Sequence, residues 1–145
     1  MSEIMLHAVL LQPAPRKLCW FHERLTDRLS ITWGVVGHLM GVQNSDALRQ
    51  AQQTVQPDVV QFSMRLGQSP AIYQGLKALK ASPVWSTYDP AQQRIIDALK
   101  RDAELAGVGL QGQERERFNA IQQELARLST EFSNHVLDAT KAFAL

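Results

Sequence analysis

The last thirty or so residues constrain the fold most, because they carry one long apolar pattern with a single period. From about Gln113 onward, apolar side chains recur every three or four residues, which is the spacing of one face of an α-helix. A helix of about thirty residues would be roughly 45 Å long. The spacing is close to a coiled-coil seam. The apolar positions of this predicted helix are Phe118, Ile121, Leu125, Leu128, Phe132, Val136, Ala139 and Phe143.

Two structural roles fit such a helix. It could be the spine of a bundle, with shorter helices packed against its apolar seam. Alternatively, it could pass out of this segment into a partner domain. The closing residues 132–145 contain neither glycine nor proline, so they carry no helix-ending signal.

The rest of the chain also predicts helices rather than strands. A first helix is expected over about 18–42, and a second is expected to start near Asn44 or Ser45. The pairs Ser69–Pro70 and Asp89–Pro90 each combine a capping residue with a proline suited to the first helical turn. Alternation with period two is absent at any length. The sequence therefore predicts an all-α fold, a helical bundle of about five to six helices with a long C-terminal helix.

Local signals also predict breaks and buried faces within these helices. Pro57 is expected to restart the helix there, because proline suits a first turn but not a helix interior. In the helix that follows Pro90, the buried stripe is expected to contain Ile95, Leu99 and either Leu105 or Ala106. Gly107 and Gly109 should end that helix.

The stretch "WGVVGHLMG", residues 33–41, is unusually rich in glycine for a helix. Gly34, Gly37 and Gly41 each cost a helix about 1 kcal/mol relative to alanine. We expect tight helix–helix packing through these glycines. The alternative is a close backbone approach to a ligand or to another chain.

Composition and charge exclude several classes of protein. The formal net charge of +1 gives no general attraction to nucleic acid, so no nucleic-acid partner is expected. No apolar run approaches the roughly 18–20 residues that cross a bilayer. The single cysteine, Cys19, rules out an internal disulfide framework. The apolar patch Ile4–Leu11 precedes its basic residues, which is the wrong order for a secretory signal, and Glu3 is unlike a transit peptide.

A search for catalytic groups gives only half-matches. "HERLT", residues 22–26, begins like the zinc motif H-E-x-x-H, but Thr26 stands where the second histidine is needed. His38 is expected to be a packed core residue and His135 a surface or interface residue. Neither these nor His7 pairs with another histidine at ligand spacing, and Cys19 has no evident base. We therefore predict no catalytic, cofactor-binding or metal-binding residue in this chain.

The order of several segments resembles a known family. "LTDRLSITWGVVGHLMGVQNSDALRQA" (25–51) and "LSTEFSNHVLDATKAF" (128–143) are similar to the amino-terminal domain of the oligopeptidase A branch of the thimet-oligopeptidase family of zinc metallopeptidases. The amino-acid sequence of these segments is most similar to the cyanobacterial and plant or algal members of that branch. The resemblance covers residues 25–145 as an N-terminal helical domain, and residues 1–24 form an atypical N-terminal segment.

The resemblance implies a fold and a function for the parent protein. Members of the family are long helical enzymes that enclose a deep channel and cleave short peptides, with zinc on an H-E-x-x-H helix far downstream. The region resembled here forms part of the channel wall. This sequence ends before any such motif, so the resemblance carries no zinc ligand onto it. It implies a non-catalytic domain or fragment whose partners are short peptides and the remaining catalytic domain, with the polypeptide continuing beyond Leu145.

Two other hypotheses remain. The chain could be a stand-alone helical module that binds peptides or proteins, and its apolar seam would then favour self-association. It could also be an enzyme in its own right, although it lacks any pair of groups placed for acid–base or nucleophilic catalysis. The resemblance implies a cytoplasmic protein, with the chloroplast or mitochondrion as the alternative, because the branch has cytosolic and organellar members.

Overall fold

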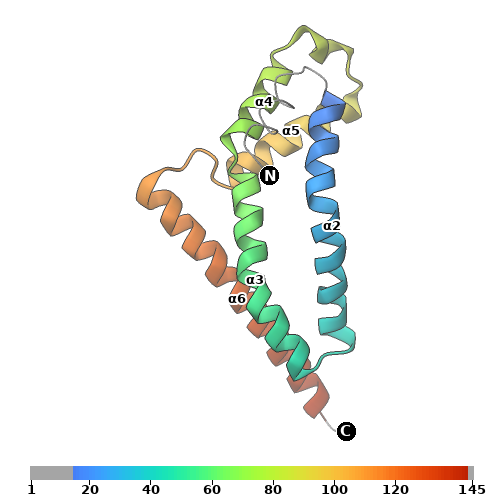
Figure 1. Ribbon diagram of the computed structural model, residues 1–145, viewed down its shortest axis with the longest axis vertical. Helices are drawn as coiled ribbons and strands as arrows, with labels where there is room; N and C mark the ends of the chain where they lie inside the picture. Colours follow the sequence, from blue (N-terminus) through green and yellow to red (C-terminus); the bar gives the residue numbers. More distant parts are fainter. Residues whose placement is uncertain (1–14, 144–145) are drawn as a thin grey trace. The chain divides into compact units, whose positions relative to one another are not determined.

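The computed structural model describes residues 15–143, with side chains described for Arg24 and for residues 26–143. This part of the chain contains five α-helices, one 3-10 helix and no strand, which confirms the predicted all-α class (Figure 1). The elements are α2 (Pro15–Val42), α3 (Asp46–Gly67), α4 (Pro70–Lys80), η1 (Pro83–Thr87), α5 (Pro90–Leu105) and α6 (Gly112–Ala142).

The helices belong to two compact units. The first contains α4, η1 and α5, together with the described part of α2 up to Arg28 and the end of α3 from Arg65. The second contains α2 and α3 between Leu29 and Met64, together with α6.

The first unit has a small apolar core between α4 and α5. Leu76, Leu79 and Ile96 are buried there, and Trp85 and Tyr88 pack against them. These two rings meet edge to face, with their centroids 6.1 Å apart. The register predicted for α5 was wrong at Ile95, which is 53% exposed, whereas its neighbour Ile96 is buried. Of the two alternatives predicted near the end of the stripe, Leu105 is 71% exposed and Ala106 is half-buried.

The predicted helix caps of the first unit are confirmed. The Ser69 hydroxyl accepts a hydrogen bond from the Ile72 N–H, at the start of α4. Asp89 accepts from the N–H groups of Ala91 and Gln92, and the Gln92 side chain accepts from the Asp89 N–H, which completes a capping box at α5. These bonds satisfy N–H groups that a helix start leaves without partners.

Two positions at the C-terminal end of α5 require glycine, Gly107 in the chain itself and Gly67 on the neighbouring α3. Gly107 has a φ of +84°, and hydrogen bonds from Gly107 to Glu104 and from Val108 to Ala103 form a Schellman motif. On α3, a β-carbon at Gly67 would lie 2.9 Å from the Ala106 β-carbon, so only glycine allows this approach.

Pro57 does not restart a helix, contrary to the sequence prediction. Helix α3 continues through it from Asp46 to Gly67, and its start is capped by the Ser45 hydroxyl, which accepts from the Leu48 N–H. The proline removes one backbone hydrogen bond. Beside the proline, Gln123 on α6 donates a hydrogen bond to the Pro57 carbonyl at 3.0 Å, which fixes α3 against α6 at this point.

Candidate functional site

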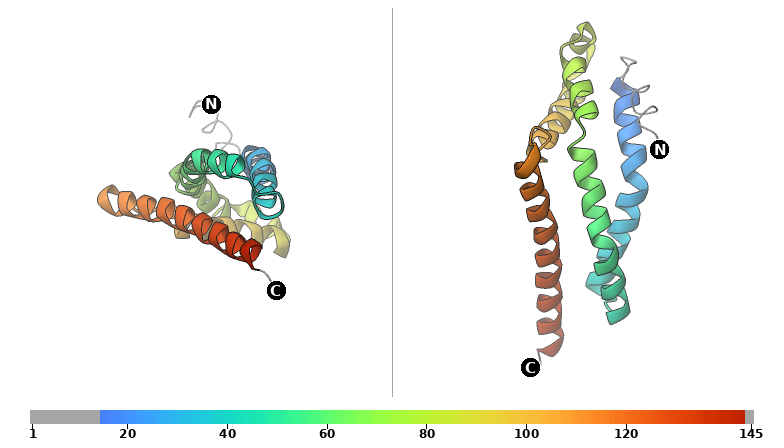
Figure 2. Two further views of the ribbon diagram at one scale, coloured as in Figure 1. Left: turned by 90° about the horizontal axis from the view of Figure 1, so that it is seen from below. Right: turned by 60° about the vertical axis from the view of Figure 1, so that its left-hand side comes forward.

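Several polar side chains link helices α3 and α6 of the second unit. Gln56 donates to the Ala126 carbonyl at 3.0 Å and to the Thr130 hydroxyl at 2.8 Å. Gln52, one turn earlier, lies 3.5 Å from the same hydroxyl. Residue numbers rise along α3 as they fall along α6, so the helices run antiparallel at this contact (Figure 2). Directional amide bonds therefore hold the register of the pair.

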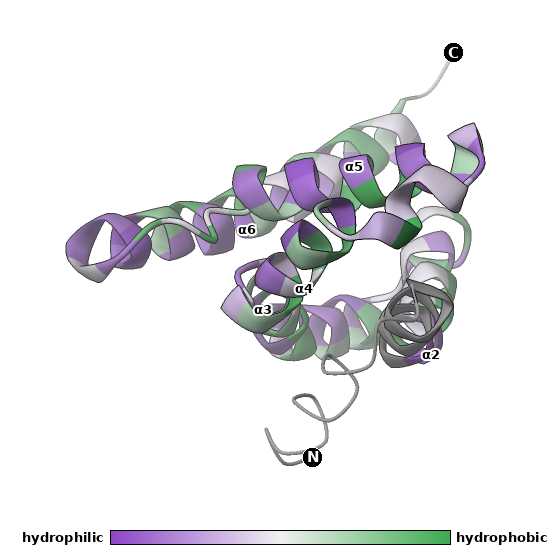
Figure 3. Cartoon of the chain, turned by 90° about the horizontal axis from the view of Figure 1, so that it is seen from above, coloured by the Kyte–Doolittle hydropathy of each residue, from purple (hydrophilic) through white to green (hydrophobic). Residues whose placement is uncertain are grey.

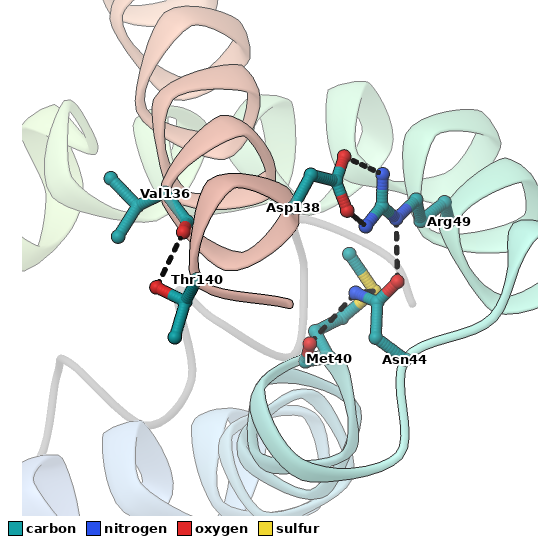
Figure 4. A network of polar contacts seen from close by, with 6 residues as sticks. All are labelled: Met40, Asn44, Arg49, Val136, Asp138 and Thr140. Carbon is teal, nitrogen blue, oxygen red and sulfur yellow. Dashed lines mark hydrogen bonds and ion pairs between the residues drawn. The ribbon is translucent and has the colours of Figure 1, made fainter. Parts of the chain in front are cut away.

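A charged network closes the C-terminal end of this contact (Figure 4). Arg49 donates from its guanidinium to both carboxylate oxygens of Asp138 and to the Asn44 side chain. Asn44 in turn donates to the Met40 carbonyl at 2.7 Å, which ties the end of α2 to the network. The hydrogen bond from Arg49 lowers the pKa of the Asp138 carboxyl. A forked Arg–carboxylate pair of this kind fixes both partners in orientation.

The apolar seam predicted on α6 is not the face that packs against α3. Large apolar side chains at six of its eight positions are exposed, with Phe132 at 70%. Figure 3 shows green apolar turns alternating with purple polar turns along α6. The contacting face carries Gln123, Ala126, Thr130 and Asn134 instead. Helix α6 therefore packs against α3 through a polar stripe, and not through the apolar seam as a bundle spine was predicted to do. The exposed seam residues are Ile121, Leu125, Leu128, Phe132, Val136 and Phe143.

The glycine stretch of α2 faces space rather than another helix. No described atom lies within 4 Å of where a β-carbon would be at Gly34, Gly37 or Gly41, beyond the helix's own backbone. The expected tight packing through these glycines is therefore wrong for the described chain. His38 is exposed, so its predicted core position is wrong as well. Gly37 and Gly41 border a cavity, whereas Gly34 and His38 are not among its lining residues.

We call this cavity the α2–α6 groove. It has a volume of about 660 Å³ and is lined by residues of α2, α3 and α6 in the second unit. Its lining contains neutral polar and apolar side chains and no charged one. The lining includes Gly37, Met40, Gln52, Phe132, Asn134 and Thr140.

Gln52 is the unusual member of the groove lining. Its side chain is buried, yet its Oε1 atom has no hydrogen-bond partner among the described residues. A buried acceptor without a partner costs about 1–3 kcal/mol. Sequence reasoning missed Gln52 and Gln56, although their spacing of four residues already places two carboxamides on one face of α3.

A second hollow is also lined by residues of α3 and α6, and its charges are paired. Arg127 forms ion pairs with Glu124 and Glu131 on α6 itself. The hydrogen bond from Arg127 lowers the pKa of Glu124. Because the cation already holds two carboxylates, this hollow offers no free charge of Arg127 to a ligand.

A polar cluster in the first unit joins α4 to α5. The Tyr73 hydroxyl and the Lys100 ammonium each donate to the Glu104 carboxylate at 2.7 Å. The hydrogen bond from Lys100, followed by that from Tyr73, lowers the pKa of the Glu104 carboxyl. The hydrogen bond to Glu104 in turn raises the pKa of the Tyr73 hydroxyl. Lys77 and Lys100 both lie against the Tyr73 ring. We interpret the cluster as a structural tie between the two helices.

The sequence candidates for chemistry do not come together in the described chain. Residues 22–26 lie in α2, but the His22 and Glu23 side chains are outside the described residues, as are His7 and the Cys19 side chain. His135 is exposed, as predicted. Among the described side chains, those of Arg24 and residues 26–143, no group of three or more His, Cys, Asp or Glu could hold a metal ion. The described residues therefore do not fit a zinc site.

Comparison with known proteins identifies the family of this chain. Residues 3–115 match the model of the neurolysin/thimet oligopeptidase N-terminal domain. The chain belongs to this family. It is 46% identical over 132 residues to a probable cytosolic oligopeptidase A of Arabidopsis thaliana. It is equally similar to an organellar oligopeptidase A of the same plant, described as chloroplastic/mitochondrial.

A bacterial relative has a lower identity. Oligopeptidase A of Haemophilus influenzae is 41% identical over 114 residues, which is 79% of this chain. The two plant alignments each cover 91% of this chain. They cover only 19% and 17% of the plant proteins, so this chain spans about a fifth of its relatives' length. None of the helices described here has the length and apolarity that crossing a membrane requires.

Proposed function

We propose that this chain is the non-catalytic N-terminal helical domain of an oligopeptidase A-like zinc metalloendopeptidase that degrades short peptides. The family match over residues 3–115 carries the proposal. The relatives are oligopeptidases, and the chain aligns with about a fifth of their length. In the proposed parent, the remaining polypeptide supplies the catalytic zinc domain. The N-terminal helical domain described here forms part of the wall of the channel that short peptides enter.

The sequence and the donor set support assigning catalysis to another part of the parent. The segment His22–Thr26 lacks the second histidine of H-E-x-x-H. The described residues do not fit zinc. We therefore derive no step of hydrolysis from side chains of this chain, and its proposed role is to bind, orient and sort peptides.

A chimera tests the proposal. The corresponding segment of the Arabidopsis cytosolic oligopeptidase A would be replaced by this chain, and cleavage of a quenched fluorescent short peptide would be measured. We expect the chimera to cleave the peptide and the isolated chain to be inactive with or without added zinc. Zinc-dependent cleavage by the isolated chain would contradict the proposal, as would a folded chimera that does not cleave.

The exposed seam of α6 favours a second candidate, a stand-alone helical module that binds a protein. A contiguous apolar stripe on a helix favours association with another surface. The isolated chain should then self-associate in sedimentation velocity, and Phe132→Glu should shift it toward monomer. A clean monomer at high concentration would argue against this candidate. The parent is proposed to act in the cytoplasm, with the chloroplast or mitochondrion as the alternative, since the relatives include both kinds.

A further inference from the structure

The second unit has no apolar core among its described residues. The buried apolar side chains of the described chain all belong to the first unit, and they are Leu76, Leu79, Ile96 and Ala103. Gln52 and Asn134, which are buried in the second unit, are polar. Burial of apolar surface is the dominant favourable contribution to folding. The described part of the second unit therefore lacks the main source of stability that the first unit has.

The apolar seam of α6 is exposed on the outer side of this unit. Phe132, near the middle of the seam, is 70% exposed. The residues of α6 that contact α3 are Gln123, Ala126 and Thr130. On a helix of about 3.6 residues per turn, the seam lies roughly opposite these three residues. Helix α6 thus presents a polar face to its own unit and an apolar face to whatever packs on the other side.

The spacing along the seam argues against a second copy of the chain as its occupant. A two-stranded coiled coil requires a continuous seven-residue repeat, and the seam keeps this repeat from Phe118 to Phe132. The repeat then points to His135, but the next apolar residue is Val136, one position later. An interruption of this kind unwinds a supercoil locally. The seam therefore fits a straight helix of a globular domain better than a supercoiled copy of α6.

The carboxylates that flank the seam are already paired within the unit. Arg127 forms ion pairs with Glu124 and Glu131, and Arg49 on α3 forms one with Asp138. These carboxylates therefore do not call for a basic partner. A surface that docks on the seam is selected by its shape and its apolar side chains rather than by its charge.

The comparisons indicate where such a surface could come from. The plant oligopeptidases align with this chain over only 19% and 17% of their length, so most of a parent of that kind lies outside this chain. A segment of the same polypeptide reaches the seam at a high effective concentration, which a separate copy of the chain does not. The remaining polypeptide is therefore a better candidate than a second copy on two independent grounds.

We infer that the α6 seam is the docking surface for an apolar helix of the parent's remaining polypeptide, and that this contact supplies the apolar core that the second unit lacks. The contact runs from Ile121 to Val136, roughly 23 Å, which needs a partner helix of about four turns. Phe132 lies within it. The identity of the occupant rests on the proposed function. The first unit has its own core around Leu76 and does not depend on this contact.

Hydrogen exchange measured by mass spectrometry tests the inference on the isolated 145-residue chain. Amide protection reports how readily each region opens. We expect the amides of residues 121–136 to exchange at least about 10-fold faster, relative to their intrinsic rates, than those of α4 and α5 around Leu76 and Ile96. Equal protection of the two regions would overturn the inference, because the second unit would then be stable without a partner.

The chimera with the Arabidopsis cytosolic oligopeptidase A supplies the partner. In it, the amides of residues 121–136 should exchange at least about 10-fold more slowly than in the isolated chain, because opening α6 now requires the docked helix to separate. The core amides of α4 and α5 serve as the internal reference. Unchanged exchange of α6 in a folded chimera would show that nothing covers the seam.

Phe132→Glu and Ser133→Glu form a matched pair of variants. Both residues are exposed neighbours on α6, and only Phe132 belongs to the seam. In the isolated chain, each change should leave the urea midpoint within about 0.3 M. In the chimera, Phe132→Glu should speed exchange of residues 121–136 by about 10- to 100-fold, because the burial of one phenylalanine is lost. Ser133→Glu should change it less than about threefold.

Phe132→Leu is the conservative variant of the same position. It keeps an apolar side chain on the seam, so exchange in the chimera should stay within about threefold of that of the unsubstituted chimera. Equal effects of Phe132→Glu and Ser133→Glu would contradict docking on the seam. A defined dimer of the isolated chain in sedimentation velocity, dissociated by Phe132→Glu, would make a second copy the occupant and would overturn the inference as well.

The outcomes separate this inference from the proposed function. A folded chimera that cleaves the short peptide but leaves residues 121–136 as exchangeable as in the isolated chain would refute the docking surface alone. A folded chimera in which these residues are protected, but which does not cleave the peptide, would refute the proposed function alone.

Discussion

Leu76→Ala should destabilise the first unit more than any other single truncation to alanine in its core. Leu76 is 1% exposed and is enclosed by Leu79, Ile96 and the Trp85 and Tyr88 rings. Burying a leucine contributes about 1.5–3 kcal/mol. A cavity adds to this loss, and measured Leu→Ala costs are about 2–5 kcal/mol. Two aromatic rings limit collapse around the site, so we expect about 3–4 kcal/mol.

The assay is urea unfolding followed by far-UV circular dichroism and tryptophan fluorescence. With a slope of about 1.5 kcal/mol/M, a loss of 3 kcal/mol moves the midpoint by about 2 M. Leu105→Ala is the matched control, because that leucine on α5 is 71% exposed and its truncation should cost under about 0.5 kcal/mol. Equal shifts for the two variants, or a loss below about 1 kcal/mol for Leu76→Ala, would refute the assignment of this core.

Three further perturbations probe local features. Asp89→Ala removes the α5 capping box and should cost about 0.5–2 kcal/mol, read by urea unfolding; no change would contradict the cap. Gly67→Ala forces a β-carbon to within 2.9 Å of Ala106 and should cost about 1–3 kcal/mol, whereas a stabilised variant would show that α5 yields easily. The pKa of Asp138 is lowered by Arg49, so this pair stabilises the fold above the ordinary carboxyl pKa of about 3.9, and the stabilisation is lost as the pH falls through the lower folded value. Asp138→Asn should therefore lower the unfolding midpoint at pH 7, and the difference should shrink as the pH falls through the lowered pKa of Asp138; a difference that does not change with pH would contradict the pairing.

Helix starts could be predicted because their chemistry is local. Ser69 and Asp89 each supply a side-chain acceptor to N–H groups two or three residues later, and a proline follows each of them. Such signals need no knowledge of what packs nearby. Pro57 shows the limit of local reasoning, because α3 continues through it with support from Gln123, which is distant in sequence.

Faces were harder to predict than boundaries. Ile95 and Ile96 are neighbours that both fit a helical stripe, and only packing against α4 decides that Ile96 is buried. On α6, periodicity identified the apolar seam, but the face that contacts α3 carries Thr130 and Asn134. Periodicity reports which residues could be buried together, and it does not report which partner is present to bury them.

The candidate groove was beyond sequence reasoning because three helices build it. Gly37 and Gln52 lie on helices joined by a short loop, but Asn134 comes from a helix far along the chain. The glycine triplet was the one signal present in the sequence. It indicated a close approach without indicating what approaches.

The glutamine-rich contact between α3 and α6 has a thermodynamic consequence. Gln56 and Gln123 hold it through amide hydrogen bonds, and the apolar seam of α6 stays exposed whether or not the helices are paired. Exposing apolar surface raises the heat capacity on unfolding, and exposing polar surface lowers it. Separating these two helices therefore adds little to the heat-capacity increment. The apolar core around Leu76 contributes in the opposite sense, because unfolding exposes its leucine, isoleucine and aromatic side chains and so raises the heat capacity.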